Sequence, residues 1–233
     1  MHCFNVTALI KHRTQIIKIK LEMINKIENT TYTTTDQSSS HPELDQRLIE
    51  VIDNLNVNSI LDVGCGAGFL SNQLADKGYE VVACDPEQSA LDLAGGQSKV
   101  SFNLLGCYDD PSKLDVSNID LVLSSEVIEH LVLPRKLIDF SGYFLKKNGL
   151  LVLSTPYYGS YIKNLICSLC NKWDDQFAVL WDGGHIKFWS LKTLTILLKE
   201  GGFELVEYKT SSKHPWPFRL VWPNNIIVVA QKK

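Results

Sequence analysis

Mostly apolar runs of strand length alternate with amphipathic stretches from residue 41 onward. The runs cover residues 59–63, 80–84, 100–105, 119–124 and 149–154. Apolar residues at helical spacing fill the stretches 44–55, 69–77, 89–94 and 134–145. Continuous apolar strands that alternate with helices indicate strands buried on both faces. The pattern therefore predicts an α/β fold in which helices cover both faces of a parallel sheet.

The pattern changes after Pro156. Residues 157–184 form a long insertion rich in aromatic residues, which predicts a lid over a substrate pocket. A helix at 191–200 and strands at 203–209 and 225–231 then complete the fold. We therefore expect one domain over residues 41–233 with a lid-like insertion at 157–184.

The N-terminal part of the chain lacks this alternation. Residues 29–40 are polar and of low complexity, which predicts a loosely ordered extension over residues 1–40. Residues 9–27 mix apolar positions with lysines and have two interpretations. Either they form a loose helix, or translation starts at Met23 and residues 1–22 are an upstream extension.

Composition narrows the functional classes. The formal net charge is −3, which argues against the basic face that a nucleic-acid-binding protein usually presents. No apolar run reaches the ~18 residues that a membrane-spanning helix requires. Three of the six cysteines lie in predicted strands or their loops, and the six show no disulfide framework. We read them as thiols of a reducing compartment, which predicts a cytoplasmic protein.

The first apolar run leads into a glycine-rich loop, Asp62-Val63-Gly64-Cys65-Gly66-Ala67-Gly68. Glycines at alternate positions allow the backbone to approach a ligand closely, and the following helix start offers free N–H groups. The dinucleotide fingerprint G-x-G-x-x-G would need its third glycine where Phe69 stands. The loop therefore indicates a nucleotide-type cofactor and disfavours a nicotinamide dehydrogenase.

This loop resembles the first motif of class I S-adenosylmethionine-dependent methyltransferases. The resemblance implies a Rossmann-like fold with a mostly parallel seven-stranded sheet whose last strand is antiparallel. It also implies S-adenosylmethionine over the carboxyl ends of the first, second and fourth strands. Asp85 would bind the ribose hydroxyls, and the loop with Cys107 and Tyr108 would meet the adenine. The cofactor-binding residues so implied are Asp62, Gly64, Cys65, Gly66, Gly68, Asp85, Pro86, Cys107, Tyr108 and Ser125.

A second motif, Ser124-Ser125-Glu126-Val127-Ile128-Glu129-His130-Leu131, resembles the fourth-strand motif of ubiquinone-biosynthesis O-methyltransferases and their small-molecule relatives. We expect a helix here that places Glu126, Glu129 and His130 on one face. Carboxylates and an imidazole on one face can bind a divalent cation or act as acid and base. His185, before a short apolar-aromatic run, would point into the same site by resemblance.

These residues leave three interpretations open. His130 and His185 are acid/base groups, or Glu126, Glu129, His130 and His185 hold Mg²⁺ as in small-RNA ribose methyltransferases, or Glu129 and His130 only anchor a helix. The overall prediction is an enzyme that transfers a methyl group to the oxygen of a small molecule. A metal-assisted RNA 2′-O-methyltransferase and a non-catalytic S-adenosylmethionine-binding protein are the alternatives. The sequence leaves the acceptor and the oligomeric state open.

Overall fold

The computed structural model describes residues 42–94, 99–177, 184–212 and 222–233. The predicted extension at 1–40 and part of the insertion lie outside these residues. The strands are β1 (Ser59–Val63), β2 (Glu80–Asp85), β3 (Ser101–Leu104), β4 (Ile119–Ser125), β5 (Leu145–Pro156), β6 (Phe203–Ser211) and β7 (Asn225–Lys232). The α-helices are α2 (Pro42–Asp53), α3 (Phe69–Asp76), α4 (Gln88–Ala94), α5 (Arg135–Phe144), α6 (Tyr161–Cys170) and α7 (Leu191–Glu200).

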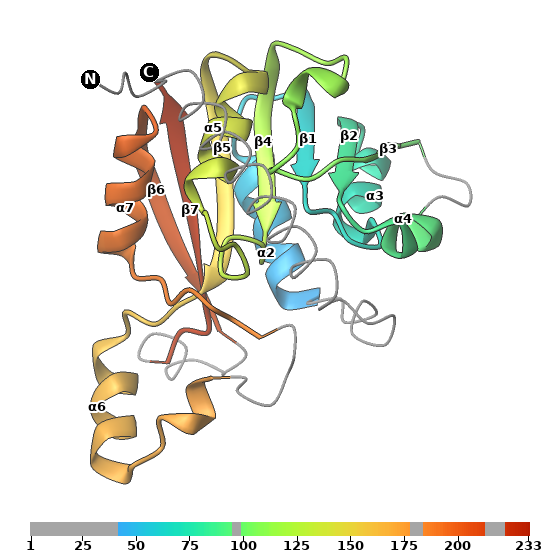
Figure 1. Cartoon of the computed structure of the whole chain (residues 1–233). Coiled ribbons are helices and arrows are strands. Elements are labelled where there is room, and N and C mark those ends of the chain that lie inside the picture. The colour runs from blue at the N-terminus through green and yellow to red at the C-terminus, as the bar shows by residue number, and fades with distance from the viewer. Residues whose placement is uncertain (1–41, 95–98, 178–183, 213–221) are drawn as a thin grey trace, which may run out of the picture.

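The strands form one seven-stranded sheet of order β3-β2-β1-β4-β5-β7-β6 (Figure 1). The pairs from β3 to β5 are parallel, whereas β7 runs antiparallel to both β5 and β6. This arrangement confirms the predicted α/β fold and its antiparallel last strand. Because β1 pairs with both β2 and β4, the carboxyl ends of these three strands meet at one edge of the sheet.

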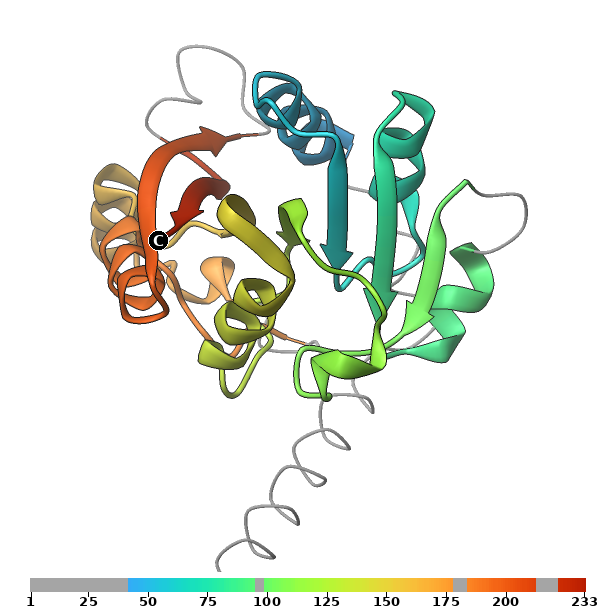
Figure 2. The same cartoon turned by 90° about the horizontal axis from the view of Figure 1, so that it is seen from above.

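Helices cover both faces of the sheet (Figure 2), and an apolar core lies between the layers on each face. Ile60 and Leu121 pack against α2 and α3, while their strand neighbours Leu61 and Val122 pack toward α5 and α7. The alternation follows from the two-residue period of a strand, and it explains why both faces of the central strands read as apolar.

The predicted helix at 126–131 is wrong. Glu126 has a left-handed φ of 56°, which ends β4 and prevents the chain from entering a helix there. Residues 126–131 instead form a turn, and the next helix, α5, begins at Arg135. Glu126, Glu129 and His130 therefore do not share a helix face, and the turn sets their positions.

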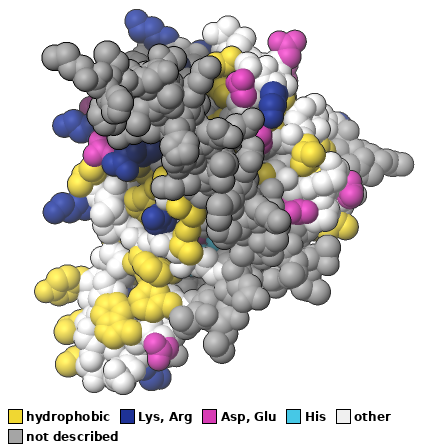
Figure 3. Space-filling view, in the orientation of Figure 1, with side chains coloured by type: hydrophobic (Ala, Val, Ile, Leu, Met, Phe, Trp, Pro, Cys, Tyr) yellow, Lys and Arg dark blue, Asp and Glu magenta, His cyan; other side chains and the backbone are white. Residues whose placement is uncertain are grey.

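The insertion contributes α6 and a short 3-10 helix, η2 (Asp174–Gln176). The helix α6 extends away from the sheet and exposes apolar side chains, among them Tyr161 at 86% and Leu169 at 78% exposed (Figure 3). Ser160 caps its start through the Lys163 N–H, and Asn171 ends it with a left-handed φ of 51°. Whether the insertion acts as a lid stays a prediction.

Candidate functional site

The glycine loop between β1 and α3 has the conformation that its sequence predicts. Gly64, Gly66 and Gly68 have φ values of 79°, 53° and 72°, a region that side chains with a Cβ rarely adopt. A Cβ on Gly64 would lie 2.4 Å from Cγ2 of Val127, and one on Gly68 would lie 2.6 Å from the Phe102 ring. A Cβ on Gly66 would meet nothing within 4 Å, so the backbone there faces open space.

The close contact at Gly64 sets the distance between two motifs. Because Gly64 has no side chain, Val127 can pack directly on the glycine loop. The turn at 126–131 therefore lies against the loop that the sequence assigns to the cofactor. This contact brings the second motif beside the first.

Asp85 joins the ends of β1 and β2. Its Oδ2 accepts a hydrogen bond from the Gly66 N–H at 2.8 Å, and its Oδ1 accepts one from the Glu87 N–H at 2.9 Å. Each carboxylate oxygen retains a second lone pair for a further donor. Burial raises the pKa of Asp85, and the two backbone N–H groups oppose that shift. Asp85 therefore links the glycine loop to the end of β2, and its contact with a ribose stays a prediction.

Asp62, near the end of β1, supports the glycine loop through a hydrogen bond to α3. It is 2% exposed, and its Oδ2 accepts a hydrogen bond from the Ser71 hydroxyl of α3 at 2.5 Å. Burial raises the pKa of Asp62 to about 7, against the opposing effect of the Ser71 hydroxyl. In this structure Asp62 therefore ties the strand end to the helix that follows the loop.

The loop after β3 is fixed by its own side chains. The Gly106 N–H donates to Asp109 Oδ2 at 2.9 Å, and a Cβ on Gly106 would lie 3.0 Å from Cβ of Pro86. Cys107 is buried in the apolar core, and the Tyr108 hydroxyl accepts a hydrogen bond from the Leu133 N–H at 3.0 Å. Pro86 and this loop thus lie together, while their contact with adenine stays a prediction.

Ser125 and Glu126 lie where β4 ends. The Ser125 hydroxyl is 2.9 Å from that of Ser154 on β5. Glu126 Oε1 accepts a hydrogen bond from Ser154 at 3.0 Å, and its Oε2 accepts one from Asn225 Nδ2 at 2.7 Å. Burial raises the pKa of Glu126. Both of its oxygens are thus engaged with β5 and β7, and Glu126 lies outside the group of potential metal ligands described next.

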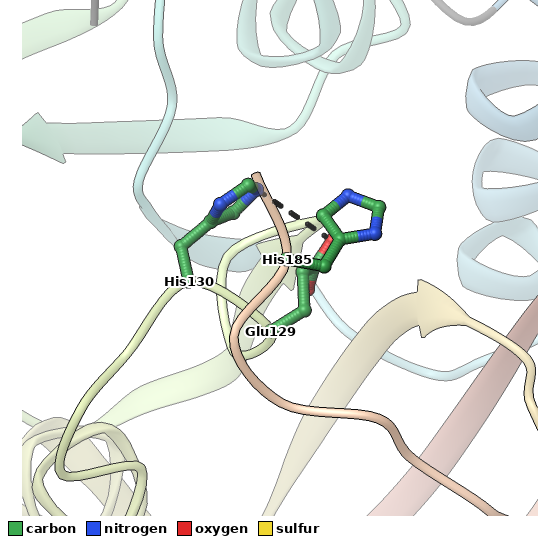
Figure 4. A group of neighbouring side chains, drawn as sticks. All are labelled: Glu129, His130 and His185. Carbon is green, nitrogen blue, oxygen red and sulfur yellow. Dashed lines mark ion pairs between the residues drawn. The ribbon is translucent and has the colours of Figure 1, made fainter. Parts of the chain in front are cut away.

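Glu129, His130 and His185 form the Glu–His–His cluster (Figure 4). One potential ligand atom from each residue lies within 4.8 Å of the other two. The His130 and His185 rings meet edge to face with centroids 5.1 Å apart, and His130 Nε2 is 3.9 Å from Glu129 Oε1. The structure thus joins three of the four residues that the sequence proposed as metal ligands.

Backbone hydrogen bonds bring the distant His185 to this cluster. The carbonyl oxygen of Glu129 accepts hydrogen bonds from the N–H groups of Ile186 and Lys187 at 3.0 and 2.9 Å. Ser190 and Thr193 then cap α7 reciprocally, which fixes where the segment ends. The segment that carries His185 is therefore attached at both ends.

The carboxylate of Glu129 is the most unusual group in the site. The side chain is fully buried, and its Oε2 accepts a hydrogen bond from the Thr155 hydroxyl at 3.0 Å. Its Oε1 has no hydrogen-bond partner. Burial, followed by the charge of Glu126, raises the pKa of Glu129 well above its usual range. A buried carboxylate oxygen without a donor is costly unless a proton, a cation or a substrate satisfies it.

The sequence did not single out Thr155 or Tyr158 as site residues. Thr155 lies on β5 and orients Glu129, and the Tyr158 hydroxyl is 3.0 Å from His185 Nδ1. Thr155 directly follows the predicted fifth strand, where parallel strands place their carboxyl ends, and Tyr158 is one of the aromatic residues of the insertion predicted at 157–184.

The sheet order, the antiparallel β7 and the glycine loop at the end of β1 define a class I methyltransferase fold. Comparison with known proteins agrees. A family model described as "Methyltransferase domain" matches residues 38–208. The chain belongs to this family and is an S-adenosylmethionine-dependent methyltransferase.

Individual methyltransferases are similar to this chain in sequence or in structure. The ubiquinone biosynthesis O-methyltransferase of Hydrogenovibrio crunogenus is 28% identical over 201 residues, which are 81% of this chain and 80% of that protein. The crystal structure of a SAM-dependent methyltransferase from Archaeoglobus fulgidus matches with a TM-score of 0.62 at 17% identity, covering 84% of this chain and 96% of that one. Magnesium protoporphyrin IX methyltransferase from Synechocystis, with bound SAH, matches with a TM-score of 0.54 at 18% identity over 82% and 80% of the two chains.

None of the helices among the described residues is long and apolar enough to cross a membrane.

Proposed function

We propose that the protein methylates a hydroxyl oxygen of a small molecule, with the Glu–His–His cluster as the group that receives the acceptor. The observation that carries this proposal is the buried Glu129 Oε1 without a hydrogen-bond partner beside two imidazoles. The similarity to ubiquinone biosynthesis O-methyltransferases supports an oxygen acceptor. The formal net charge of −3 supports a small acceptor over an RNA chain.

The glycine loop and the strand ends would bind the cofactor. Gly66 leaves the backbone open to a ligand, and Asp85 would accept hydrogen bonds from the ribose hydroxyls. Pro86, Cys107 and Tyr108 would border the adenine. Bound S-adenosylmethionine supplies an activated methyl group, so the protein mainly has to align an acceptor oxygen with it.

The acceptor must lose its hydroxyl proton as the methyl group is transferred. His130 or His185 would take this proton, because an imidazole with an ordinary pKa near neutrality can accept it at physiological pH. Burial lowers the pKa of His185, which favours the neutral ring that a base requires. Glu129 would stabilise the resulting imidazolium, since its oxygen already lies 3.9 Å from His130 Nε2.

A divalent cation is the second candidate for this cluster, and the unpartnered Glu129 Oε1 favours it. Glu129, His130 and His185 would hold it, and it would lower the pKa of the acceptor hydroxyl. Two imidazoles and one carboxylate suit Mn²⁺, Fe²⁺ or Zn²⁺ better than Mg²⁺, which prefers oxygen ligands. Among the described residues, Glu126 does not join this set.

The test is methyl transfer from radiolabelled S-adenosylmethionine to matched aromatic acceptors. Catechols would be compared with the corresponding aminophenols and anilines, and with a short RNA. We expect label on the hydroxyl oxygen of the catechols, and none on the aniline or the RNA. Transfer to the amines or the RNA alone would overturn the proposed acceptor class.

A further inference from the structure

Tyr158 contacts the proposed catalytic cluster from outside it. Its hydroxyl oxygen lies 3.0 Å from Nδ1 of His185. The backbone of Tyr158 is held at both ends, because its N–H donates to the Trp189 carbonyl at 3.0 Å and its carbonyl accepts from Asn164 Nδ2 at 2.9 Å. This residue is therefore built into the segment that leads from β5 to α6.

The ring of Tyr158 is fixed as firmly as its backbone. It stacks on Phe177 with centroids 5.9 Å apart and meets Phe188 edge to face at 5.0 Å. Phe177 in turn contacts Phe188 at 4.8 Å and stacks on Trp173 at 6.3 Å. A hydroxyl on a ring held from two sides has little freedom to move, so its oxygen stays within hydrogen-bond distance of His185 Nδ1, where either group can be the donor.

A neutral imidazole carries its proton on one nitrogen and its lone pair on the other, and the partner of one nitrogen decides which. We propose that Tyr158 is a positioning residue that accepts a hydrogen bond from Nδ1–H of His185 and thereby keeps the lone pair on Nε2. This inference rests on the proposed function, because a base or a cation ligand at His185 needs that lone pair. It also gives the insertion a role, since Tyr158 and the Phe177 ring that stacks on it both belong to the insertion.

The variant Tyr158→Phe tests the inference with little disturbance. Phenylalanine keeps the ring between Phe177 and Phe188 and removes only the hydroxyl. Tyr161→Phe is the matched control, because Tyr161 lies three residues away on α6 and is 86% exposed. Equal thermal midpoints of the two variants would show that both retain the fold.

Two measurements give independent readouts. Multiple-bond ¹H–¹⁵N spectra of ¹⁵N-histidine-labelled protein report which nitrogen of His185 is protonated, with His185→Gln used for assignment. We expect the Nδ1–H tautomer in the native protein and in Tyr161→Phe, and a mixture of tautomers in Tyr158→Phe. With an acceptor, we expect kcat of Tyr158→Phe to fall about 10- to 100-fold, the usual range for such outer partners, with the Kd for S-adenosylmethionine unchanged.

An Nε2–H tautomer of His185 in the native protein would overturn the inference. So would a Tyr158→Phe variant whose His185 tautomer and kcat equal those of the native protein. The spectra need no acceptor, so they separate this inference from the proposed function. If the native protein methylated no hydroxyl but its His185 were locked in the Nδ1–H form, the proposed acceptor class would fail while the positioning role stood.

Discussion

Replacing Gly66 with alanine is expected to weaken S-adenosylmethionine binding at least ~10-fold while leaving the fold in place. A Cβ at this position meets no protein atom within 4 Å, so it does not disturb the packing of the free protein. The φ of 53° costs an alanine about 1 kcal/mol, which a domain of this size tolerates. The added methyl group would occupy the open space in which the cofactor is proposed to lie, so we expect affinity to fall at least ~10-fold in calorimetry.

Gly202→Ala is the matched control for this prediction. Gly202 also has a left-handed φ, 82°, and a Cβ there also meets nothing within 4 Å, but it lies in the turn between α7 and β6. The free energy of unfolding of Gly202→Ala should fall by about as much as that of Gly66→Ala, and its affinity for S-adenosylmethionine should not change. Equal affinity of Gly66→Ala and the native protein would mean that the cofactor does not approach the loop at this residue.

Glu129→Gln is expected to stop turnover without affecting cofactor binding. Glutamine keeps the shape of the side chain and can still accept the Thr155 hydrogen bond, but it cannot ionise and so cannot offset a positive charge beside His130. Whether the cluster holds a histidine base or a divalent cation, the variant no longer provides a carboxylate to stabilise the positive charge. We expect kcat to fall by roughly 10²- to 10⁴-fold, with the Kd for S-adenosylmethionine within about twofold.

Chelation then distinguishes the two candidates for the cluster. If a cation acts here, removing divalent ions should abolish the native activity and adding Mn²⁺ or Zn²⁺ should restore it, with no rescue of Glu129→Gln. If a histidine is the base, chelation should have no effect, and His185→Asn should lose activity as Glu129→Gln does. Glu80→Gln, an exposed residue at the start of β2, is the control. Full activity of Glu129→Gln would remove this cluster from the mechanism.

The sequence predicted well those features that depend on neighbouring residues. The glycine loop needs only local spacing, and its left-handed backbone appears at all three glycines. The position of Asp85 at the end of β2 follows from the apolar run that precedes it. Features of this kind follow from strand and helix periodicity and from the carboxyl-edge rule of parallel sheets.

The predicted helix at 126–131 failed because local spacing competes there with long-range contacts. Ser154 and Asn225 hold the Glu126 side chain, and a left-handed Glu126 then turns the chain away from a helix. The contacts of Thr155 and Tyr158 are also long-range, since each reaches a residue more than twenty positions away. Periodicity carries no information about such pairs, so these residues became visible only in the folded chain.

Asp85 joins the glycine loop to the second strand. Measuring the affinity of Asp85→Asn for S-adenosylmethionine therefore tests the cofactor site most directly. Native protein and variant would each be titrated with S-adenosylmethionine and, separately, with NAD by calorimetry. We predict that the native protein binds S-adenosylmethionine and not NAD, and that Asp85→Asn weakens this binding about 10- to 100-fold, as the loss of a charged hydrogen-bond partner implies. Unchanged affinity in Asp85→Asn, or binding of NAD in place of S-adenosylmethionine, would contradict the account.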